Sequence, residues 1–336
     1  MDPTIKKIIE SKTFCAPLLI FKLLYISISN TELLTRVMGK KLSYTFLLFL
    51  SISLALFFQP TNAGSLVVYW GQNNGDGHLI DTCDSGLFQI VNIAFLSTFG
   101  RDRSPQLNLA GHCVPNKCQN LRNSIKNCQN KGIKIMLSIG GEYKNTYSLS
   151  SREDAMQLAD YIWNNFLGGN SDSRPFGDAI LDGVDFDIEG GSNLHYATLA
   201  IKLHDHYNSD SRKKYYLTAA PMCPFQDNIL QRALSTRLFD YVWVQFYNNP
   251  ICNFDANNPT NFKNSWNQWI NTITAKNFFV GLPASTNAAQ NGFVPSPNLI
   301  NQLLPIVRSP KYGGVMIWDR FHDMTSKYSS QIKGSV

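Results

Sequence analysis

The chain has 336 residues, of which 44% are hydrophobic and 16% are charged. This is an ordinary globular composition that supplies enough apolar side chains for a large core. The net charge of +6 is concentrated near the N-terminus, because residues 1–63 hold seven basic and three acidic residues. The remaining 23 basic and 21 acidic residues leave about +2, so neither nucleic acid nor an anionic membrane surface is an expected partner.

The end of the N-terminal 63 residues has the pattern of a targeting segment. A short basic stretch (Met38–Lys41) precedes an uncharged apolar run (Tyr44–Phe58), and Thr61–Ala63 provides small residues for cleavage. This order is typical of a secretory signal peptide. A membrane anchor is less favoured, because the 15 residues of the run fall short of the about 20 that span a bilayer. We therefore expect a protein secreted to the apoplast or the vacuole, without stable membrane association after cleavage.

An extension of 37 residues precedes this signal peptide. Because a complete signal peptide begins at Met38, we expect Met38 to be the true start. A second apolar run, Phe14–Ser29, is interrupted by Lys22. If the longer form is made, that run could act as an uncleaved anchor.

Six cysteines follow the leader, which itself contains Cys15. They are Cys83, Cys113, Cys118, Cys128, Cys223 and Cys252. An even number behind a signal peptide predicts three disulfides, for which the sequence alone allows 15 pairings. Zinc binding is the competing interpretation, but no two of these cysteines form C-x-x-C and no histidine lies at ligand spacing beside them. We expect no metal and no other cofactor.

Beyond residue 64, short β-branched and aromatic runs alternate with helical stretches. The expected strands are Leu66–Trp70, Gln89–Leu96, Ile133–Ile139, Gly183–Ile188, Tyr216–Ala220, Tyr241–Gln245, Phe278–Leu282 and Gly314–Trp318. Several are apolar almost throughout, as strands of a parallel sheet covered on both faces should be. Helical periodicity is expected over Arg152–Phe166, Asn193–Tyr207 and Asn298–Arg308. The fold class is therefore α/β, with residues 64–336 forming a single (β/α)₈ TIM barrel.

Three acidic residues alternate along the fourth expected strand: Asp185, Asp187 and Glu189. Residues two apart on a strand point to the same face, so all three should point into the barrel and rise to its C-terminal end. Like charges and burial both raise carboxyl pKa values, which favours a shared proton and a protonated Glu189 as a general acid. The alternatives are a solvated charged strand and a calcium site. Large apolar residues between the acids, and the lack of an EF-hand spacing, argue against both.

Two motifs carry a resemblance to a known family. Asp182–Glu189 (DGVDFDIE) is similar to the catalytic signature of family 18 glycoside hydrolases, and Ser138–Gly141 (SIGG) is similar to that family's second motif. Six further segments resemble plant class III chitinases of the hevamine type. These segments are Val68–Gln72, Val91–Phe95, Leu109–Cys113, Leu217–Pro221, Tyr241–Asn249 and Tyr312–Met316. The resemblance covers nearly all of the chain beyond the leader.

The resemblance implies an endo-acting chitinase that retains configuration through substrate assistance, an exception to the two-carboxylate scheme. Glu189 would protonate the glycosidic oxygen while the acetamido carbonyl of the substrate attacks the anomeric carbon. Asp187 would orient the acetamido N–H, Asp185 would balance the proton on Asp187, and Tyr247 would donate to the acetamido oxygen. Chitin or chitooligosaccharides are the implied substrates, and we expect a monomer.

The same resemblance implies further cleft residues and the disulfide pairing. Trp318 would form the floor beneath a sugar ring, whereas core packing is the alternative role for both Trp318 and Tyr247. The remaining candidates for the cleft are Gln245, Tyr69, Met222 and Asn248. The implied disulfides are Cys83–Cys128, Cys113–Cys118 and Cys223–Cys252.

The sequence departs from close relatives at two places. The glycine-rich loop of relatives is replaced after Gly141 by Glu142–Tyr147, which is bulkier and one residue longer, and Met222 stands where relatives tend to carry glutamine. Both departures are expected at the cleft, where they bear on substrate preference. Two rival functions therefore stay open: a non-catalytic lectin or inhibitor on the same barrel, and hydrolysis of peptidoglycan or acylated chitooligosaccharides.

Overall fold

The computed structural model of the chain describes residues 64–142 and 145–336. The N-terminal extension, the expected signal peptide and two residues of the Glu142–Tyr147 loop lie outside the described residues. Among the helices in the described ranges, none is long and apolar enough to cross a membrane.

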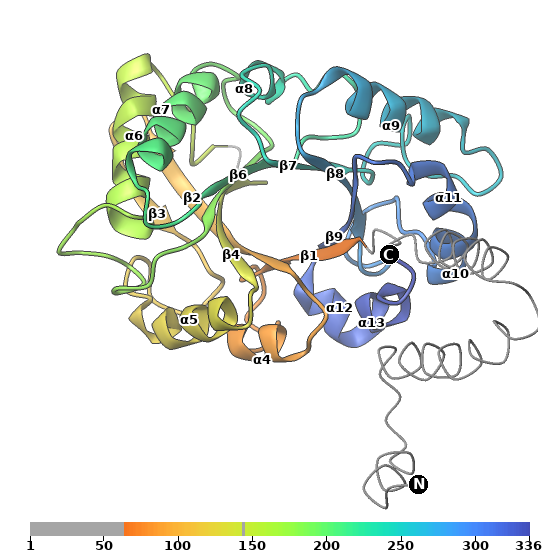
Figure 1. Cartoon of the computed structure of the whole chain (residues 1–336), viewed down its shortest axis with the longest axis horizontal. Helices are drawn as coiled ribbons and strands as arrows, with labels where there is room; N and C mark the ends of the chain where they lie inside the picture. Colours follow the sequence, from red (N-terminus) through yellow and green to blue (C-terminus); the bar gives the residue numbers. More distant parts are fainter. Residues whose placement is uncertain (1–63, 143–144) are drawn as a thin grey trace, which may run out of the picture. The chain divides into compact units, whose positions relative to one another are not determined.

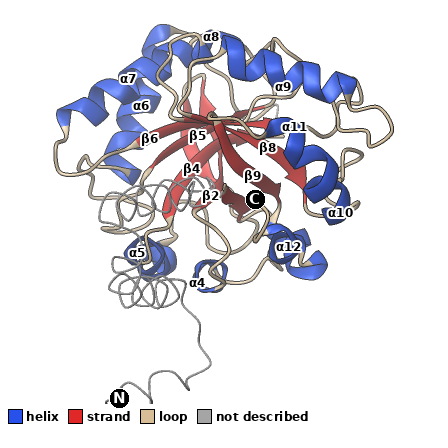
Figure 2. Ribbon diagram, turned by 45° about the vertical axis from the view of Figure 1, so that its right-hand side comes forward, coloured by secondary structure: helices blue, strands red, loops and turns tan. Residues whose placement is uncertain are grey.

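Eight parallel strands form a closed ring with the helices on its outside (Figures 1 and 2). The strands are β1 (Ser65–Trp70), β2 (Ile90–Gly100), β4 (Lys134–Gly141), β5 (Gly183–Ile188), β6 (Tyr216–Ala219), β7 (Tyr241–Gln245), β8 (Asn277–Pro283) and β9 (Tyr312–Trp318). Pairing of β1 with both β2 and β9 closes the ring. The (β/α)₈ TIM barrel expected from the sequence is therefore confirmed.

A short hairpin on β2 was not expected. Strand β2 continues to Gly100, four residues past its predicted end, and pairs antiparallel with β3 (Arg103–Leu107). The two residues between these strands, Arg101 and Asp102, both have positive φ values, of 54° and 59°. Two-residue hairpin turns need such values and usually take glycine or asparagine for them. The sequence lacks that signal, so the pattern alone did not predict the hairpin.

Helices cover the outside of the barrel. Their bounds are α4 (Leu79–Asp84), α5 (Arg122–Asn130), α6 (Arg152–Phe166), α7 (Tyr196–Ser209), α8 (Gln231–Leu234), α9 (Thr260–Thr272), α10 (Ser296–Asn298), α11 (Leu304–Val307), α12 (Arg320–Ser326) and α13 (Tyr328–Ile332). The predicted bounds of α6 are confirmed, and α7 begins three residues later than expected. The third expected helix is present as one continuous helical stretch, in which α10 passes through a π-helical segment (Leu299–Leu303) into α11. Pro305 lies at the start of α11 and has no N–H to continue a regular helix.

Two hydrophobic layers hold the barrel together, and β5 contributes to only one of them. Val184, Phe186 and Ile188 pack in the layer between strands and helices. The other face of β5 places Asp185 and Asp187 inside the barrel, where both are almost completely buried. The predicted alternation along this strand is therefore confirmed.

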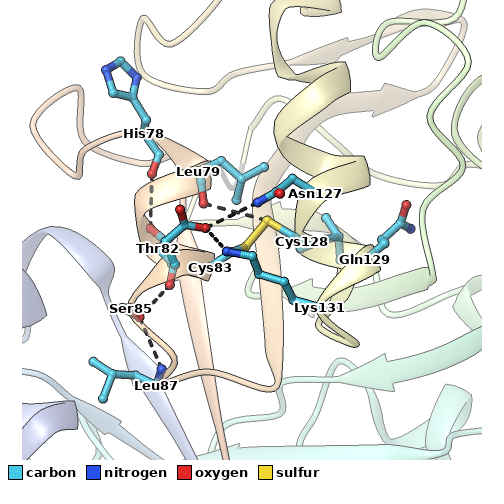
Figure 3. Close-up of a disulfide and its surroundings, with 12 residues drawn as sticks. His78, Leu79, Thr82, Cys83, Ser85, Leu87, Asn127, Cys128, Gln129 and Lys131 are labelled. Atoms are coloured by element: carbon cyan, nitrogen blue, oxygen red, sulfur yellow. Dashed lines mark hydrogen bonds and ion pairs between the residues drawn. A yellow bond between two sulfur atoms is a disulfide. The ribbon is translucent and has the colours of Figure 1, made fainter.

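Three disulfides join loops and helices around the barrel, with the pairings that the resemblance implied: Cys83–Cys128, Cys113–Cys118 and Cys223–Cys252. The first links α4 to α5 (Figure 3). Beside it, Lys131 forms an ion pair with Asp84, and Asn127 donates to the same carboxylate at 3.3 Å. The third links the loop after β6 to the loop after β7.

Candidate active site

A cleft of about 570 Å³ opens at the C-terminal end of the barrel strands. Its walls come from the ends of β4 to β9, which is where barrel enzymes keep their active sites. The lining residues are Glu142, Glu189, Met222, Gln245, Tyr247, Asn248, Asn249, Asn287, Ala288, Ala289, Gln290 and Trp318. Six of the predicted site residues are therefore brought together in one cleft: Glu189, Tyr247, Trp318, Gln245, Met222 and Asn248.

Asp185 lies at the bottom of the carboxylate row, buried in the barrel. Its carboxylate accepts hydrogen bonds from the hydroxyls of Tyr69 (2.7 Å), Ser138 (2.7 Å) and Thr218 (2.8 Å). Burial raises the pKa of Asp185 to about 6, although the three hydrogen bonds act in the opposite direction. Removal from water is therefore the stronger influence at this position.

Tyr69 lies beneath the cleft, since only 1% of its surface is exposed. Its hydroxyl donates to Asp185 and accepts from the indole N–H of Trp243 at 2.9 Å. Tyr69 was predicted to line the cleft, and this prediction is wrong, because the side chain is buried below the cleft. We assign Tyr69 to the groups that support Asp185, because the only polar atom of its side chain, the hydroxyl, is used below the cleft floor.

Asp187 lies one step higher, between Asp185 and Glu189. The side-chain amide of Gln245 donates to Asp187 Oδ1 at 2.9 Å, and also to the carbonyl oxygen of Ala220 at 2.9 Å. Burial, together with the charges of Glu189 and Asp185, raises the pKa of Asp187 well above its usual range. The neutral form of Asp187 is thereby favoured in the resting state.

Glu189 is the uppermost member of the row and is partly exposed to the cleft. Its backbone N–H donates to the hydroxyl of Tyr147 at 3.0 Å. Gln245 Nε2 lies 3.5 Å from Glu189 Oε1, so one amide contacts both upper carboxylates. The strand and the two side-chain contacts thus hold Glu189 at the cleft surface with Asp187 directly below it.

Tyr247 lines the cleft beside this row, although it is only 6% exposed. Burial is the largest cause that raises the pKa of Tyr247 well above its usual value, followed by the charges of Asp187 and Glu189. The phenol therefore stays protonated and is able to donate a hydrogen bond. Core packing and a cleft role were the two alternatives for Tyr247. The residue combines them, because most of its side chain is buried while it still lines the cleft.

Trp318 ends β9 and faces the cleft with a partly exposed ring. Below it, the ring of Tyr69 lies edge-on at 5.5 Å, and that of Phe95 is stacked at 6.1 Å. The indole is thus held by core aromatics on one side and open on the other. An exposed indole face backed in this way suits contact with a sugar ring.

The loop Glu142–Tyr147 is only partly a cleft element. Glu142 lines the cleft, whereas Tyr147 is 1% exposed and stacks on Phe99 at 5.1 Å. The Tyr147 hydroxyl donates to the carbonyl oxygen of Gly141 at 2.6 Å and accepts from Glu189 N–H. Tyr147 therefore joins the end of β4 to the end of β5, and the sequence analysis did not foresee this role.

One wall of the cleft was missed by sequence analysis: residues 287–290, in the loop after β8. This loop is held against the loop after β7, because the Gln290 N–H donates to Asn248 Oδ1 at 2.9 Å. Asn249 was likewise not among the predicted binding residues. Position alone could have indicated both, since they follow barrel strands at the C-terminal end. Across the residues in the described ranges, no group of three or more histidines, cysteines and acidic residues could hold a metal ion.

Raising the pH from about 4 to about 7 should destabilise the wild type relative to Asp185→Asn. Between the usual pKa of 3.8 and the native value of about 6, the native state keeps a proton that the unfolded chain has lost. Stability therefore falls as the pH rises through this window and stays level above it. The difference in unfolding free energy between wild type and variant should fall by about 3 kcal/mol. Urea unfolding of both proteins at the two pH values measures it, and a difference independent of pH would contradict the burial argument.

Comparisons with known proteins agree with this geometry. A sequence profile described as Glycosyl hydrolases family 18 matches residues 65–296. A basic endochitinase of Nicotiana tabacum is 57% identical over 302 residues, which cover 89% of this chain and all of the relative. A solved chitinase of Ipomoea carnea has a TM-score of 0.78 and 49% identity over 81% of this chain and 100% of its own. A xylanase and α-amylase inhibitor protein of Scadoxus multiflorus has a TM-score of 0.76 and 41% identity, with 81% and 99% covered.

A cleft at the carboxyl end of a (β/α)₈ barrel, with a glutamate above buried aspartates, has the organisation of a glycoside hydrolase. The chain belongs to family 18 of the glycosyl hydrolases, as its resemblance to plant class III chitinases predicted.

Proposed function

We propose that this protein is a secreted endochitinase that hydrolyses β-1,4-linked N-acetylglucosamine polymers with retention of configuration. The observation that carries the proposal is the stacked row itself: Glu189 faces the cleft, and Asp187 lies buried directly beneath it. The names of close relatives support the substrate, since several are endochitinases. The inhibitor relative shows that this barrel also serves other roles. The proposal of a catalytic function therefore depends on the three acidic residues Asp185, Asp187 and Glu189.

In the proposed reaction, Glu189 donates its proton to the glycosidic oxygen as the bond to the anomeric carbon breaks. The acetamido carbonyl oxygen of the same sugar attacks that carbon and forms an oxazolinium ion. Water, deprotonated by Glu189, then opens the ring and returns the proton to the glutamate. Two inversions at one carbon give net retention.

The groups around Glu189 have the properties that this reaction needs. Asp187 would accept a hydrogen bond from the acetamido N–H, and its negative form would stabilise the positive charge that develops on the sugar. Asp185 can hold a proton while Asp187 is ionised, because its own pKa is raised to about 6. Tyr247 keeps its phenolic proton and would donate a hydrogen bond to the acetamido oxygen.

Secretion is supported by the chemistry of the cysteines. Three disulfides join six of the seven cysteines of the chain. Such bonds persist in oxidising compartments and are rare in the cytosol of most organisms. An extracellular or vacuolar location, reached through the signal peptide, accommodates them.

The purified protein should release short oligomers from chitin whose new reducing ends are initially in the β configuration. Proton NMR of chitohexaose hydrolysis, recorded before mutarotation, distinguishes the β from the α anomer. Initial α product would contradict retention. Binding of chitohexaose without any hydrolysis would instead support the lectin or inhibitor alternative, and preference for peptidoglycan or acylated oligomers in the same assay would redefine the substrate.

Tyr147→Phe should lower kcat by about tenfold to a hundredfold, because the Glu189 backbone loses the hydrogen bond that positions it. Stability should fall by about 1–3 kcal/mol, since the carbonyl of Gly141 and the N–H of Glu189 lose a buried partner. Steady-state kinetics on chitohexaose and urea unfolding measure the two effects.

Tyr196→Phe is the matched control. Tyr196 is also fully buried, and its hydroxyl has no hydrogen-bond partner among the described residues. The control should leave both kcat and stability nearly unchanged. A Tyr147→Phe variant that is less stable but has an unchanged kcat would limit Tyr147 to a structural role.

A further inference from the structure

A second, smaller depression of about 210 Å³ lies beside the cleft. It is bordered by the loop after β6, the loop after β7 and helix α9. Among the described residues that line it, none is charged. The side chains that matter for its chemistry are Pro224, Phe225, Ile251, Asn261, Asn264 and Gln268.

The two depressions share the same loops. Met222 lines the cleft and the next residue, Cys223, lines the second depression. Asn249 lines the cleft, and its carbonyl accepts the N–H of Cys252, which lines the second depression, at 3.0 Å. The cleft and the second depression are therefore built on the same two loops.

Three amide side chains form one wall. Asn261, Asn264 and Gln268 are spaced three and four residues apart on α9, which places them along one face of the helix. All three are exposed. An amide offers both a donor and an acceptor, so this row suits a neutral ligand that carries hydroxyl and acetamido groups.

Another part of the lining is apolar. Ile251 is 70% exposed, one of the few large hydrophobic side chains among the described residues that are open to solvent. Phe225 is partly exposed, and its ring packs at 5.1 Å and 88° against buried Trp269. Apolar side chains and a row of amides in one depression form a combination that suits the C–H face and the polar edge of a sugar ring.

The depression is also held rigidly. The disulfide Cys223–Cys252 ties its two loops together with a Cα–Cα distance of 5.9 Å. From α9, Ser265 Oγ and Trp269 Nε1 both donate to the carbonyl of Cys223, at 2.6 and 3.0 Å. A wall fixed in this way loses little conformational entropy when a ligand binds.

We propose that this depression is an accessory subsite that binds an N-acetylglucosamine unit of the chitin chain outside the catalytic cleft. The proposal rests on the proposed chitinase function for the identity of the sugar. Its effect is to anchor the enzyme on the insoluble polymer, while the cleavage of short soluble oligomers depends on the cleft alone.

The test compares Asn264→Ala/Gln268→Ala with the control Asn267→Ala. Asn267 is an exposed amide on the same helix that does not line the depression. In a Glu189→Gln background, the double variant should bind insoluble chitin about tenfold more weakly, because two hydrogen bonds are lost. With Glu189 intact, it should hydrolyse chitotetraose at the wild-type rate and insoluble chitin more slowly. The control should match the wild type in every assay.

A double variant that turns over chitotetraose normally and binds insoluble chitin as tightly as the control would overturn the accessory subsite. Failure of the wild type itself to cleave chitotetraose would overturn the proposed function instead. A second measurement uses no depression variant: NMR signals of the side-chain amides of Asn264 and Gln268 should shift when chitobiose is added to Glu189→Gln. Unmoved signals at saturating chitobiose would also reject the subsite.

Discussion

Glu189→Gln should reduce the hydrolysis of chitohexaose by about 10²- to 10⁴-fold, the range that general acid–base catalysis contributes. Glutamine has the size of glutamate and keeps the backbone contact to Tyr147, but it has no proton to give to the leaving oxygen. Binding of the oligosaccharide should therefore persist. Turnover assays and calorimetric titration with chitohexaose separate the two quantities.

Glu142→Gln is the matched control for that variant, because Glu142 is the other carboxylate that lines the cleft. It lies on the loop after β4 and is exposed to solvent. The control should change KM more than kcat. A large loss of kcat in Glu142→Gln together with a small one in Glu189→Gln would reverse the assignment of the acid.

Asp187→Asn should lower kcat by about 10²- to 10³-fold, as expected when one preorganised electrostatic group is lost. Stability and oligosaccharide affinity should change little, because the resting state favours neutral Asp187, which asparagine resembles in shape. Asparagine can still accept the hydrogen bond from Gln245 through Oδ1. It cannot become negative when positive charge develops on the sugar, so the defect should appear in kcat.

Measurements of kcat, KM and urea unfolding on wild type and Asp187→Asn test this argument. An unchanged kcat would mean that Asp187 acts only as a neutral hydrogen-bonding group. A large loss of stability would mean instead that Asp187 is ionised in the resting enzyme, since an uncharged replacement would then remove a charge on which its neighbours depend.

The sequence predicted the barrel because each strand carries its own local signal. Apolar runs such as Val242–Val244 lie on strands that are buried on both faces, and this pattern is readable without any knowledge of neighbours. The hairpin after β2 was missed, since Arg101 and Asp102 lack the residue types that usually mark such a turn. The π-helical segment before α11 was missed as well, although Pro305 was available as a signal.

Those site residues could be predicted that lie along the single strand of acidic residues or within segments that resemble the family. Glu189, Tyr247 and Trp318 meet in the cleft as expected. Tyr69 was misplaced, because its distance from the surface depends on the aromatic rings packed above it. Gln245 was proposed as a cleft residue, but its contacts with both Asp187 and Glu189 could not be predicted from spacing.

The sequence by itself determined that the carboxylates of β5 share one face, because side chains alternate along any extended strand. It also determined where the barrel strands lie, through their buried apolar runs. Only the tertiary structure decided which groups surround those carboxylates. Tyr147, Tyr69 and Gln245 come from strands or loops that are 42 to 116 residues away from the acids they contact. Such contacts arise when the barrel closes and its side chains pack, and no local pattern along the chain encodes them.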